Sequence, residues 1–371
     1  MKYVDEFRDP QQAADLSRAI ATAAKGLTEK QIRLMEVCGT HTMAIFRFGL
    51  RQMLPENIGL ISGPGCPVCV TATSDIDRAV ELCQRQNVTV VTFGDMVRVP
   101  GTSMSLAQAQ AQGGRVEVVY SAFDALKLAR QSPGQEFVFM GIGFETTAPT
   151  VAAALYQARE EKLANFSVLS SHKVLPPALE ALLGSGKARV SGFIMPGHVT
   201  TIIGAQAYEQ VAKAHGLPCV VSGFEPNDIL ASILMLIREL TTGDSRVLIQ
   251  YQRGATWEGN RIAQKIMQQV FAPADALWRG LGLIPGSGLE PGPEFAPYDA
   301  ALRFDLPRAA ESEVKDPPGC RCGEVLQGLI TPQQCSLFKK ACTPRTPVGP
   351  CMVSSEGTCA AYFKYAGEAQ P

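Results

Sequence analysis

The stretch SGPGCPVCV at residues 62–70 places two thiols, Cys66 and Cys69, two residues apart directly after a short apolar run. One turn of chain brings both sulfurs within reach of a metal ion or of each other, so the motif is typical of zinc knuckles, of redox-active dithiols and of turns whose cysteines merely pack. Zinc would need a second such pair, and the sequence contains no other C-x-x-C. Pro64 and Pro67 stiffen the loop just before a predicted helix, which favours a redox-active dithiol.

A second concentration of sulfur lies at the carboxyl end, where residues 320–371 hold six of the 11 cysteines. The spacing C-x-C-x12-C-x6-C-x8-C-x7-C comes from Cys320, Cys322, Cys335, Cys342, Cys351 and Cys359. Zinc ribbons and fingers mostly use paired knuckles, whereas a [4Fe-4S] cluster accepts four thiolates from irregular loops. The spacing therefore favours an iron-sulfur cluster over zinc, and the two remaining thiols would form a dithiol/disulfide pair beside it.

The motif CGTHT places Cys38 and His41 three residues apart, after a predicted strand and at the start of a predicted helix. At that spacing a thiolate and an imidazole can bind one metal ion or form a nucleophile with its base. The alternative is a buried cysteine beside a hydrogen-bonded histidine. That alternative is weakened because three of the 4 histidines, His41, His172 and His198, follow predicted strands.

Two carboxylates, Glu145 in GFETTAP and Asp95 in FGDM, also follow predicted strands. Helix capping by Thr146 or Thr147, with Pro149 in the first turn, explains much of the GFETTAP motif. We therefore weigh a functional and a structural role equally for both carboxylates. Nucleotide binding has weak support, because the chain has no G-x-x-x-x-G-K-S/T loop and GIGFET is a poor dinucleotide fingerprint.

Short β-branched runs alternate with helical patterns through the first two thirds of the chain, which predicts parallel sheets built from βαβ units. The predicted strands are 32–37, 58–61, 88–92, 116–119, 137–140, 166–169, 190–194 and 219–221. Four motifs recur in one order at a nearly constant offset: RLMEVCGTHT with FVFMGIGFETTAP, GLISGPGCPVC with SVLSSHKVLPP, VVTFGDMVRVPG with GFIMPGHVTTIIG, and VVYSAFDAL with VVSGFEPNDIL. The repetition predicts a duplicated α/β half.

The predicted fold class is α/β, with two similar doubly wound (Rossmann-like) parallel-sheet domains facing a central cleft and a Cys-rich iron-sulfur domain at the carboxyl end. The expected divisions are a helical segment at 1–30, α/β domains at 31–133 and 134–240, and a helical and Cys-rich domain at 241–371. The residues expected to line the cleft are Cys38, Thr40, His41, Cys66, Cys69, Asp95, Glu145, Thr146, Thr147, His172 and His198.

The region after residue 240 has a different character. Residues 257–271 predict one amphipathic helix, and PGSGLEPGPEFAP at 285–297 predicts a loop because it is too rich in Pro and Gly for regular structure. The cysteine-rich tail has too few apolar residues for a core of its own, so we expect it to need a metal to hold its shape.

Charge and hydropathy exclude several classes of partner. The formal net charge is -1, from 34 basic and 35 acidic residues without long runs of either sign, so we expect no nucleic acid and no membrane as partners. Residues 1–8 carry acids where a signal peptide needs an apolar segment, and the best apolar run, 229–237, is too short to span a bilayer. We expect a cytoplasmic protein, and in that reducing compartment clustered thiols point to metal binding or redox chemistry.

The ordered motifs CGTHT, GPGCPVC, FGDMVRVPG, GFETTAP, MPGHV, CMVSSEG and CAAY, with the tail C-x-C, resemble the HypD family of hydrogenase maturation proteins from about residue 30 to residue 365. The resemblance implies a [NiFe]-hydrogenase maturation factor that helps to assemble the Fe(CN)2CO unit with a small HypC-type chaperone and accepts cyanide from a HypE-type donor. It implies that Cys38 binds this transient iron, which carries CN and CO ligands, with His41 beside it. Cys66 and Cys69 would be the neighbouring redox pair.

The tail is similar in layout to ferredoxin:thioredoxin reductase, in which a C-x-C supplies one cluster ligand and one redox thiol. That likeness assigns the [4Fe-4S] cluster to Cys320, Cys335, Cys342 and Cys359. It assigns a second dithiol to Cys322 and Cys351, with Cys351 as an alternative fourth cluster ligand. The implied mechanism relays electrons from the cluster through this dithiol to the pair at residues 66 and 69, where they support S–CN cleavage.

Two other functions fit parts of the pattern. A ferredoxin-linked thiol-disulfide reductase acting on protein disulfides would use the same tail, but it would not need Cys38 and His41. A zinc-stabilised scaffold that only binds partners would need no redox chemistry. The resemblance favours an assembly scaffold with thiol and iron-sulfur redox chemistry over a conventional turnover enzyme.

Overall fold

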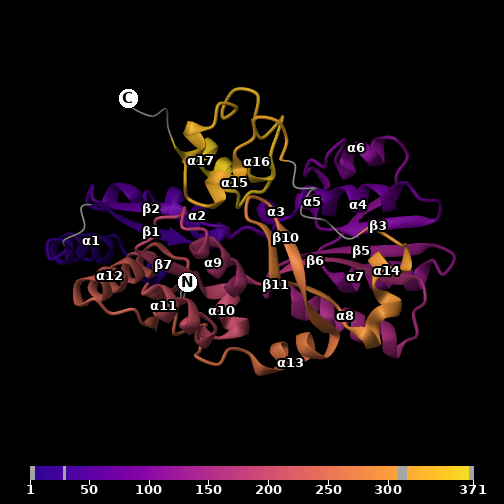
Figure 1. The fold of residues 1–371 in the computed structure, drawn as a ribbon, viewed down its shortest axis with the longest axis horizontal. Coiled ribbons are helices and arrows are strands. Elements are labelled where there is room, and N and C mark those ends of the chain that lie inside the picture. The colour runs from indigo at the N-terminus through magenta and orange to yellow at the C-terminus, as the bar shows by residue number, and fades with distance from the viewer. Residues whose placement is uncertain (1–4, 28–30, 308–315, 367–371) are drawn as a thin grey trace.

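The computed structural model describes residues 5–27, 31–307 and 316–366, so parts of the predicted segments 1–30 and 241–371 lie outside the described residues. Two mostly parallel sheets stand next to one another with helices on their faces, and the carboxyl-terminal region lies over the zone between them (Figure 1). The predicted α/β class is therefore confirmed. Within the described ranges, no helix combines the length and the apolar character needed to cross a membrane.

The first sheet has the strand order β2-β1-β7-β8-β9 and is parallel throughout. Its strands are β1 (Ile32–Glu36), β2 (Ile58–Ser62), β7 (Gly192–Pro196), β8 (Cys219–Ser222) and β9 (Val247–Ile249). The second sheet has the order β10-β11-β6-β5-β3-β4. Its strands are β3 (Val88–Thr92), β4 (Val116–Val118), β5 (Glu136–Gly143), β6 (Phe166–Lys173), β10 (Phe271–Trp278) and β11 (Gly282–Pro291). All the predicted strands are present, with ends shifted by a few residues.

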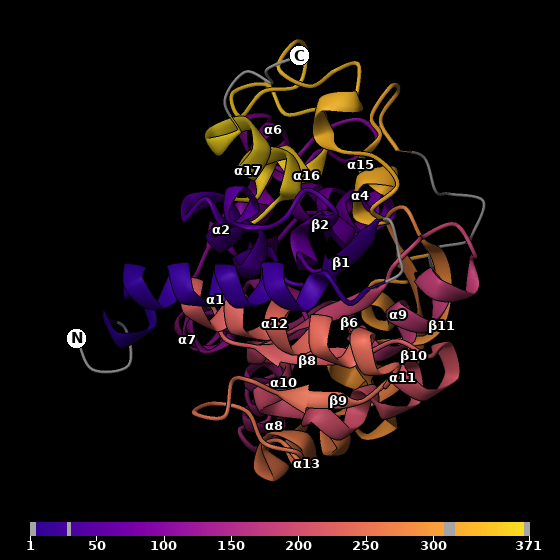
Figure 2. The same ribbon diagram turned by 90° about the vertical axis from the view of Figure 1, so that its left-hand side faces the viewer.

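Each of the strands β1–β8 is followed within a few residues by a helix, as βαβ units require. The longer ones are α1 (Pro10–Ala24), α2 (Gly39–Arg47), α4 (Thr73–Gln84), α7 (Ala122–Gln131), α8 (Ala148–Glu160), α9 (Leu175–Gly184), α12 (Pro226–Thr242), α13 (Arg261–Val270) and α17 (Thr358–Tyr365). The shorter ones are α3 (Pro67–Val70), α5 (Gly94–Val97), α6 (Leu106–Ala111), α10 (Gly197–Ile203), α11 (Glu209–His215), α14 (Ala300–Arg303), α15 (Cys322–Leu326) and α16 (Pro350–Val353). Helix α1 lies against α12 beside the first sheet (Figure 2).

The two halves of the chain exchange strands. β1 and β2 of the first half lie beside β7 and β8 of the second, whereas β3 and β4 lie beside β5 and β6. When β1–β4 are matched to β5–β8 by the sequence repeat, the order β2-β1-β7-β8 becomes β6-β5-β3-β4, which is the order in the second sheet. The duplicated frame is present, but the predicted domains 31–133 and 134–240 do not coincide with the sheets, because each sheet takes strands from both halves.

The loop predicted at 285–297 is wrong, because β11 spans Gly282–Pro291 and pairs antiparallel with β10, and the 3-10 helix η4 spans Pro293–Tyr298. Pro and Gly are tolerated there because β11 pairs with β6 only at Gly288 and Leu289, and because a register shift interrupts its ladder with β10 between Ile284 and Gly288. The helix predicted at 257–271 is shorter than expected. It begins after Asn260, whose side chain caps it, and ends at Val270, where the chain enters β10.

A shared apolar core fills the zone between the sheets. Met35 and Phe193 from the first sheet and Val138 and Met140 from the second belong to one cluster of fully buried side chains. Carboxyl ends of central strands from both sheets approach this zone, since Phe144, just after β5, belongs to the same cluster. Side chains that follow the strands are therefore the ones this fold can bring together.

The cysteine-rich tail packs onto helices of the first half. Helix α17 lies on α2, where the rings of Tyr362 and Phe46 meet edge to face with centroids 4.5 Å apart, and α16 lies on α3. Leu326 and Met352 of the tail are buried in the shared core. The tail therefore completes part of its core with residues of the α/β body.

Candidate functional site

The motifs CGTHT and GPGCPVC meet at the ends of the neighbouring strands β1 and β2. Cys38 is the N-cap residue of α2, and Cys66 is the N-cap residue of α3. The Gly39 amide donates to the Gly65 carbonyl oxygen at 3.2 Å. A Cβ atom on Gly65 would lie 2.1 Å from the Cys38 nitrogen, so only glycine lets the two loops approach this closely.

A buried carboxylate supports the loop of Cys38. The Cys38 amide donates to Glu36 Oε2 at 3.1 Å, and the Thr42 hydroxyl donates to Glu36 Oε1 at 2.5 Å. Burial raises the pKa of Glu36 to about 7. Burial also raises the pKa of the Cys38 thiol to about 12, and the nearby Glu356 acts in the same direction. The Cys38 thiol is therefore protonated at neutral pH until a metal or another cation replaces the proton.

His41 is buried beside Cys38 and has a fixed tautomer. Its Nε2 lies 2.9 Å from the Gly223 carbonyl oxygen, which can only accept, so Nε2 carries the proton. Burial lowers the pKa of His41 to about 4, so the ring is neutral. Its Nδ1 has no hydrogen-bond partner among the described residues and keeps a lone pair. Phe224 stacks on His41 at 4.7 Å and on the exposed His198 at 3.8 Å.

A segment of the tail, residues 351–357, packs over the loops that carry Cys38 and Cys66. Thr40 donates to Glu356 Oε1 at 2.7 Å, and a Cβ atom on Gly39 would lie 2.6 Å from the Glu356 Cβ. Ser354 lies between Cys66 Sγ and Asp95 Oδ2, at 3.5 Å from each. The structure thus gathers Cys38, His41, Cys66, Asp95 and His198, all predicted site residues, around one tail loop.

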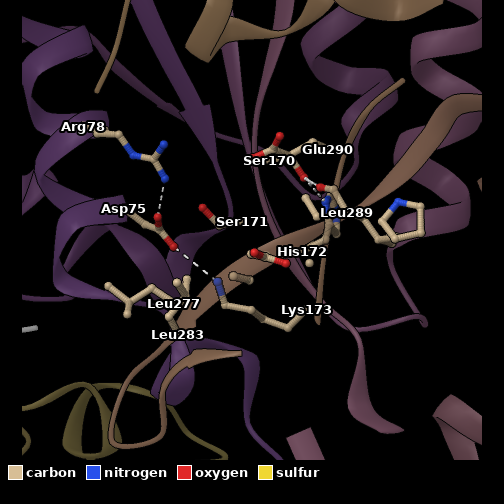
Figure 3. A pocket seen from close by; sticks show the side chains of 15 residues that line it. Asp75, Arg78, Ser170, Ser171, His172, Lys173, Leu277, Leu283, Leu289 and Glu290 are labelled. Carbon is tan, nitrogen blue, oxygen red and sulfur yellow. Dashed lines mark hydrogen bonds and ion pairs between the residues drawn. The ribbon is translucent and has the colours of Figure 1, made fainter. Parts of the chain in front are cut away.

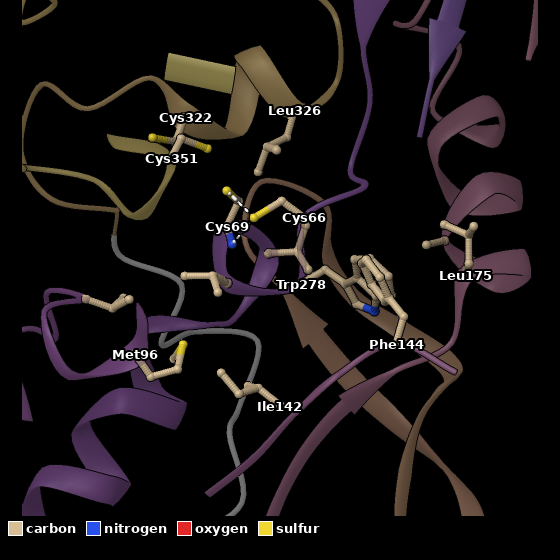
Figure 4. Close-up of a cluster of buried hydrophobic side chains, with 14 of the residues drawn as sticks. Cys66, Cys69, Met96, Ile142, Phe144, Leu175, Trp278, Cys322, Leu326 and Cys351 are labelled. Carbon is tan, nitrogen blue, oxygen red and sulfur yellow. Dashed lines mark hydrogen bonds between the residues drawn. The ribbon is translucent and has the colours of Figure 1, made fainter. Parts of the chain in front are cut away.

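Two tail thiols, Cys322 and Cys351, lie on the side of the tail that faces the pair Cys66 and Cys69 (Figure 4). Cys69 Sγ lies 2.7 Å from Cys66 Sγ. Cys351 belongs to α16, which packs on α3, and it is near enough to influence the pKa of Cys69. Cys351 in turn contacts Cys322 and Cys359. Burial raises the pKa of Cys69 well above its ordinary value, so this thiol is protonated at neutral pH. All the cysteines are free thiols in the structure.

The tail end of this row of thiols borders a small cavity within the tail. Its lining holds five thiols and mainly apolar side chains, and the thiols are Cys320, Cys322, Cys335, Cys342 and Cys359. Four thiolates from irregular loops in an apolar surround are the donor set that a [4Fe-4S] cluster uses, so these residues fit that cofactor. In the part of the chain that the structure describes, no three His, Cys, Asp or Glu side chains converge as they would around a single metal ion.

Glu145 lies apart from the thiols, although it follows β5 as predicted. Its Oε1 accepts from the Leu175 amide at 2.9 Å, and burial raises its pKa to about 7. It lines a separate cavity with residues of α9 and α13, among them Pro176 and Met267. His172 also lies elsewhere, in a cavity formed with the β10–β11 hairpin.

Sequence reasoning gave no role to Glu36, Phe224, Ser354 or Glu356. A usable signal existed for three of them. Glu36 is an acid inside an apolar strand, and such a buried carboxylate needs dedicated partners. Ser354 and Glu356 lie in CMVSSEG between two tail cysteines. Phe224 follows β8 without any distinguishing pattern.

The chain is similar to known proteins over nearly its whole length. The family model HypD, described as the hydrogenase formation hypA family, matches residues 11–366. The chain is 45% identical to hydrogenase maturation factor HypD2 of Bradyrhizobium diazoefficiens, over 98% of this chain and 97% of that protein. It is 44% identical to HypD of Rhodobacter capsulatus over 99% of both chains, and 45% identical to HypD of Escherichia coli over 98% of both. The chain therefore belongs to the HypD family of hydrogenase maturation factors.

Proposed function

We propose that this protein binds an iron ion at Cys38 while cyanide and carbon monoxide ligands are attached to it. The iron is cargo destined for a [NiFe]-hydrogenase, a HypC-type chaperone shares it, and a HypE-type protein supplies the cyanide, in the cytoplasm. The observation that carries the proposal is the pairing of Cys38 with a neutral His41 at the point where the dithiol Cys66/Cys69 also arrives. A thiolate suits a soft, π-backbonding iron better than an oxygen ligand does.

The surroundings of Cys38 support a site in which a metal ion replaces the proton of the Cys38 thiol. Burial and the Glu356 carboxylate oppose an isolated thiolate, so a cation is the favourable replacement for the proton. The partly protonated Glu36 lies two residues away and holds the Cys38 amide, so it orients the loop. The unpartnered His41 Nδ1 supplies a lone pair that can bind the ion or accept a proton from an incoming ligand.

The chain of thiols supports electron transfer by thiol–disulfide exchange. A Cys351 thiolate attacks Cys69 Sγ of a Cys66–Cys69 disulfide, which releases Cys66 as the thiolate and leaves a Cys69–Cys351 mixed disulfide. Cys322 then attacks Cys351 Sγ and releases Cys69. Two electrons have then moved to the pair beside Cys38, and a Cys322–Cys351 disulfide remains. Cys351 influences the pKa of Cys69 and is itself influenced by Cys322, so the three thiols are neighbours, which supports this order of exchange.

The thiols at the other end of this chain match the donor set of a [4Fe-4S] cluster. Cys320, Cys335, Cys342 and Cys359 would hold it, because all four line the cavity and Cys351 does not. A [4Fe-4S] cluster would supply single electrons to the neighbouring thiols. Cys322 lines the same cavity and neighbours Cys351. This position suits a thiol that passes electrons from the cluster toward Cys351 and the pair Cys66/Cys69.

The test compares Cys38→Ala with Cys219→Ala in protein purified anaerobically with its small chaperone. Cys219 is a matched control, because it is a buried thiol of the same sheet whose pKa burial also raises to about 12. We expect Cys38→Ala to lose the nitrile and carbonyl infrared bands and the cargo iron while the visible cluster absorption stays. Cargo iron that persists in Cys38→Ala, or that is lost equally in Cys219→Ala, would overturn the proposal.

A ferredoxin-linked disulfide reductase is the second candidate, because the same chain of thiols would serve it. Such an enzyme would reduce a protein disulfide at Cys66/Cys69 whether or not Cys38 is present. Reduced ferredoxin and a disulfide-bonded test protein separate the two functions. Full reductase turnover in Cys38→Ala would favour the reductase, and turnover that is absent in the wild-type protein would exclude it.

A further inference from the structure

The turn of the β10–β11 hairpin carries a fully buried arginine. Arg279 directly follows β10, and its side chain is only 1% exposed. Arginine is almost never buried this completely unless its guanidinium finds partners, because the charge must give up its hydration. Neither the proposed iron binding nor the proposed thiol exchange uses this side chain, although the turn packs against the cysteine-rich tail.

The guanidinium of Arg279 joins the two segments that carry the thiols. Its Nε donates to the Thr71 carbonyl oxygen at 3.1 Å, two residues after Cys69. Its Nη1 donates to Asp316 Oδ1 at 3.0 Å, four residues before the C-x-C of the tail. The Arg279 amide also donates to the Val70 carbonyl oxygen at 2.9 Å. One residue therefore connects the end of the dithiol helix α3 to the segment that leads into the tail thiols.

Two glycines bring the backbone beside Arg279 into direct contact with the tail. Gly280 has a φ of +80°, and a Cβ atom on it would lie 2.4 Å from the Gly323 Cα. The Gln327 side chain donates to the Gly280 carbonyl oxygen at 2.6 Å. Because Gly323 directly follows Cys322 in α15, the hairpin turn packs on the helix that begins with this cysteine. A side chain at either glycine would push the turn and the helix apart.

The hairpin that presents Arg279 is itself anchored beside α4. Leu277 and Leu283, on either side of the turn, lie next to the ion pair of Lys173 and Asp75 (Figure 3). The two charged groups are 3.5 Å apart, and their side chains are only 3% and 5% exposed. Since Asp75 belongs to α4, which follows α3 almost directly, the turn has a fixed position relative to the dithiol.

The contacts of Arg279 depend on the shape of its side chain as well as on its charge. The planar fork lets Nε and Nη1 bind two partners at once, whereas a lysine has a single nitrogen on a flexible stem. Nη2 is buried and has no hydrogen-bond partner among the described residues, so it is a further donor at this junction. The counter-charge, Asp316, is 27% exposed, so the link is more accessible on its tail side.

We propose that Arg279 is a positioning residue that fixes the tail against the dithiol helix α3, so that Cys351 can exchange with both Cys322 and Cys69. This inference rests on the thiol exchange proposed above. A thiolate must approach the disulfide sulfur in a defined direction, and a misplacement of about 1 Å can slow such a step about a hundredfold. Arg279 itself takes no part in the bonds that form and break.

The experiment follows reduction of the Cys66–Cys69 disulfide in the full-length protein with its cluster in place. The disulfide is formed with diamide, the cluster is reduced with dithionite, and the free thiols are alkylated at intervals and identified by mass spectrometry. We expect Arg279→Met to slow the reduction at least about tenfold and to leave the visible cluster absorption unchanged. Arg279→Lys should slow it similarly, because one nitrogen cannot span Thr71 and Asp316.

Three further variants complete the comparison. Arg303→Met is the matched control, because it removes an arginine that pairs with Glu136, and it should react at the wild-type rate. Asp316→Ala covers the case in which Arg279→Met fails to fold, since it breaks the link at a partly exposed residue, and it should slow the reduction at least about threefold. Cys322→Ser gives the background rate of reduction that bypasses the exchange.

The possible results separate this inference from the exchange on which it rests. Reduction in the wild-type protein that is no faster than in Cys322→Ser would overturn the exchange and this inference together. Wild-type rates in Arg279→Met, Arg279→Lys or Asp316→Ala would overturn this inference alone, as would equal slowing in Arg303→Met. A merely structural Arg279 would lower the free energy of unfolding and leave the reduction rate of the folded protein unchanged.

Discussion

The two repeated halves of this protein place different chemistry on the same strand ends. After β1 the chain reads Cys38, Gly39 and then His41, whereas the matching residues at the end of β5 and just after it are Ile142, Gly143 and Glu145. After β2 the dithiol follows, and the residues that match Cys66 and Cys69 after β6 are Val174 and Pro177. The frame is shared, and the sulfur chemistry occupies only one copy of it.

The segments that cover the two copies differ in the same way. The cysteine-rich tail packs on α2 and α3 of the first copy, and the β10–β11 hairpin packs on β6 and α9 of the second. The strand ends of the first half are therefore covered by a segment rich in thiols, and those of the second half are covered by apolar side chains and backbone. Function in a duplicated fold depends on what covers each strand end as much as on the strand end itself.

The largest effect should come from removing one cluster thiol. In anaerobic protein, Cys359→Ser should abolish the visible absorption of the cluster, because the cavity then has one thiolate too few. Cys351→Ser should keep the absorption and lose reduction of Cys66/Cys69, measured by thiol alkylation and mass spectrometry. The opposite pattern would make Cys351 the fourth ligand.

Gly65→Ala should strongly lower the free energy of unfolding, because Gly65 lies in the repeated half that carries the thiols. Its Cβ would lie 2.1 Å from backbone, so the two motif loops would have to separate, at a cost of about 3 kcal/mol or more in urea unfolding. Gly59→Ala is the control, because its nearest contact would be an ordinary 3.7 Å. Equal stability of the two variants would show that the loops do not need this close approach.

The buried Glu145 predicts a pH dependence of stability in the other copy. Its pKa is raised from 4.5 to about 7, so the unfolded chain loses this proton first and the contribution of Glu145 to stability declines between those pH values. Glu145→Gln should therefore raise the unfolding free energy at pH 8 by about 3 kcal/mol and leave it unchanged near pH 4.

Glu36→Gln provides the comparison in the thiol copy. Its pKa is raised equally, but its carboxylate also accepts from the Cys38 amide and from Thr42. A glutamine keeps only one acceptor oxygen, so the gain at pH 8 should be smaller than for Glu145→Gln. A gain of the same size would mean that these hydrogen bonds do not stabilise the Cys38 loop.

The smallest effect should come from the tail loop. Ser354→Ala removes the side chain between Cys66 and Asp95, and also the acceptor for the Glu356 amide at 3.2 Å. We expect a loss of about 1 kcal/mol in unfolding free energy. The exposed neighbour Ser355 provides a matched control, because Ser355→Ala should have no measurable effect.

The sequence predicted the strands well, because buried parallel strands read as β-branched runs such as VTVVT at 88–92. It did not predict which strands pair, since periodicity reports burial and not the identity of a neighbour. The repeat predicted where His41 and Glu145 fall relative to their strands. It could not show that only His41 would meet the thiols, because that depends on the packing of a tail more than three hundred residues away.

Strand exchange has a consequence for synthesis on the ribosome. β1 and β2 emerge early, but their neighbour β7 is not made until residue 196, and β11, which covers the edge of β6, ends only at residue 291. The nascent amino-terminal half thus exposes unpaired strand edges and reduced, reactive thiols for much of translation. We therefore expect the nascent amino-terminal half to need chaperone protection until the later strands are made.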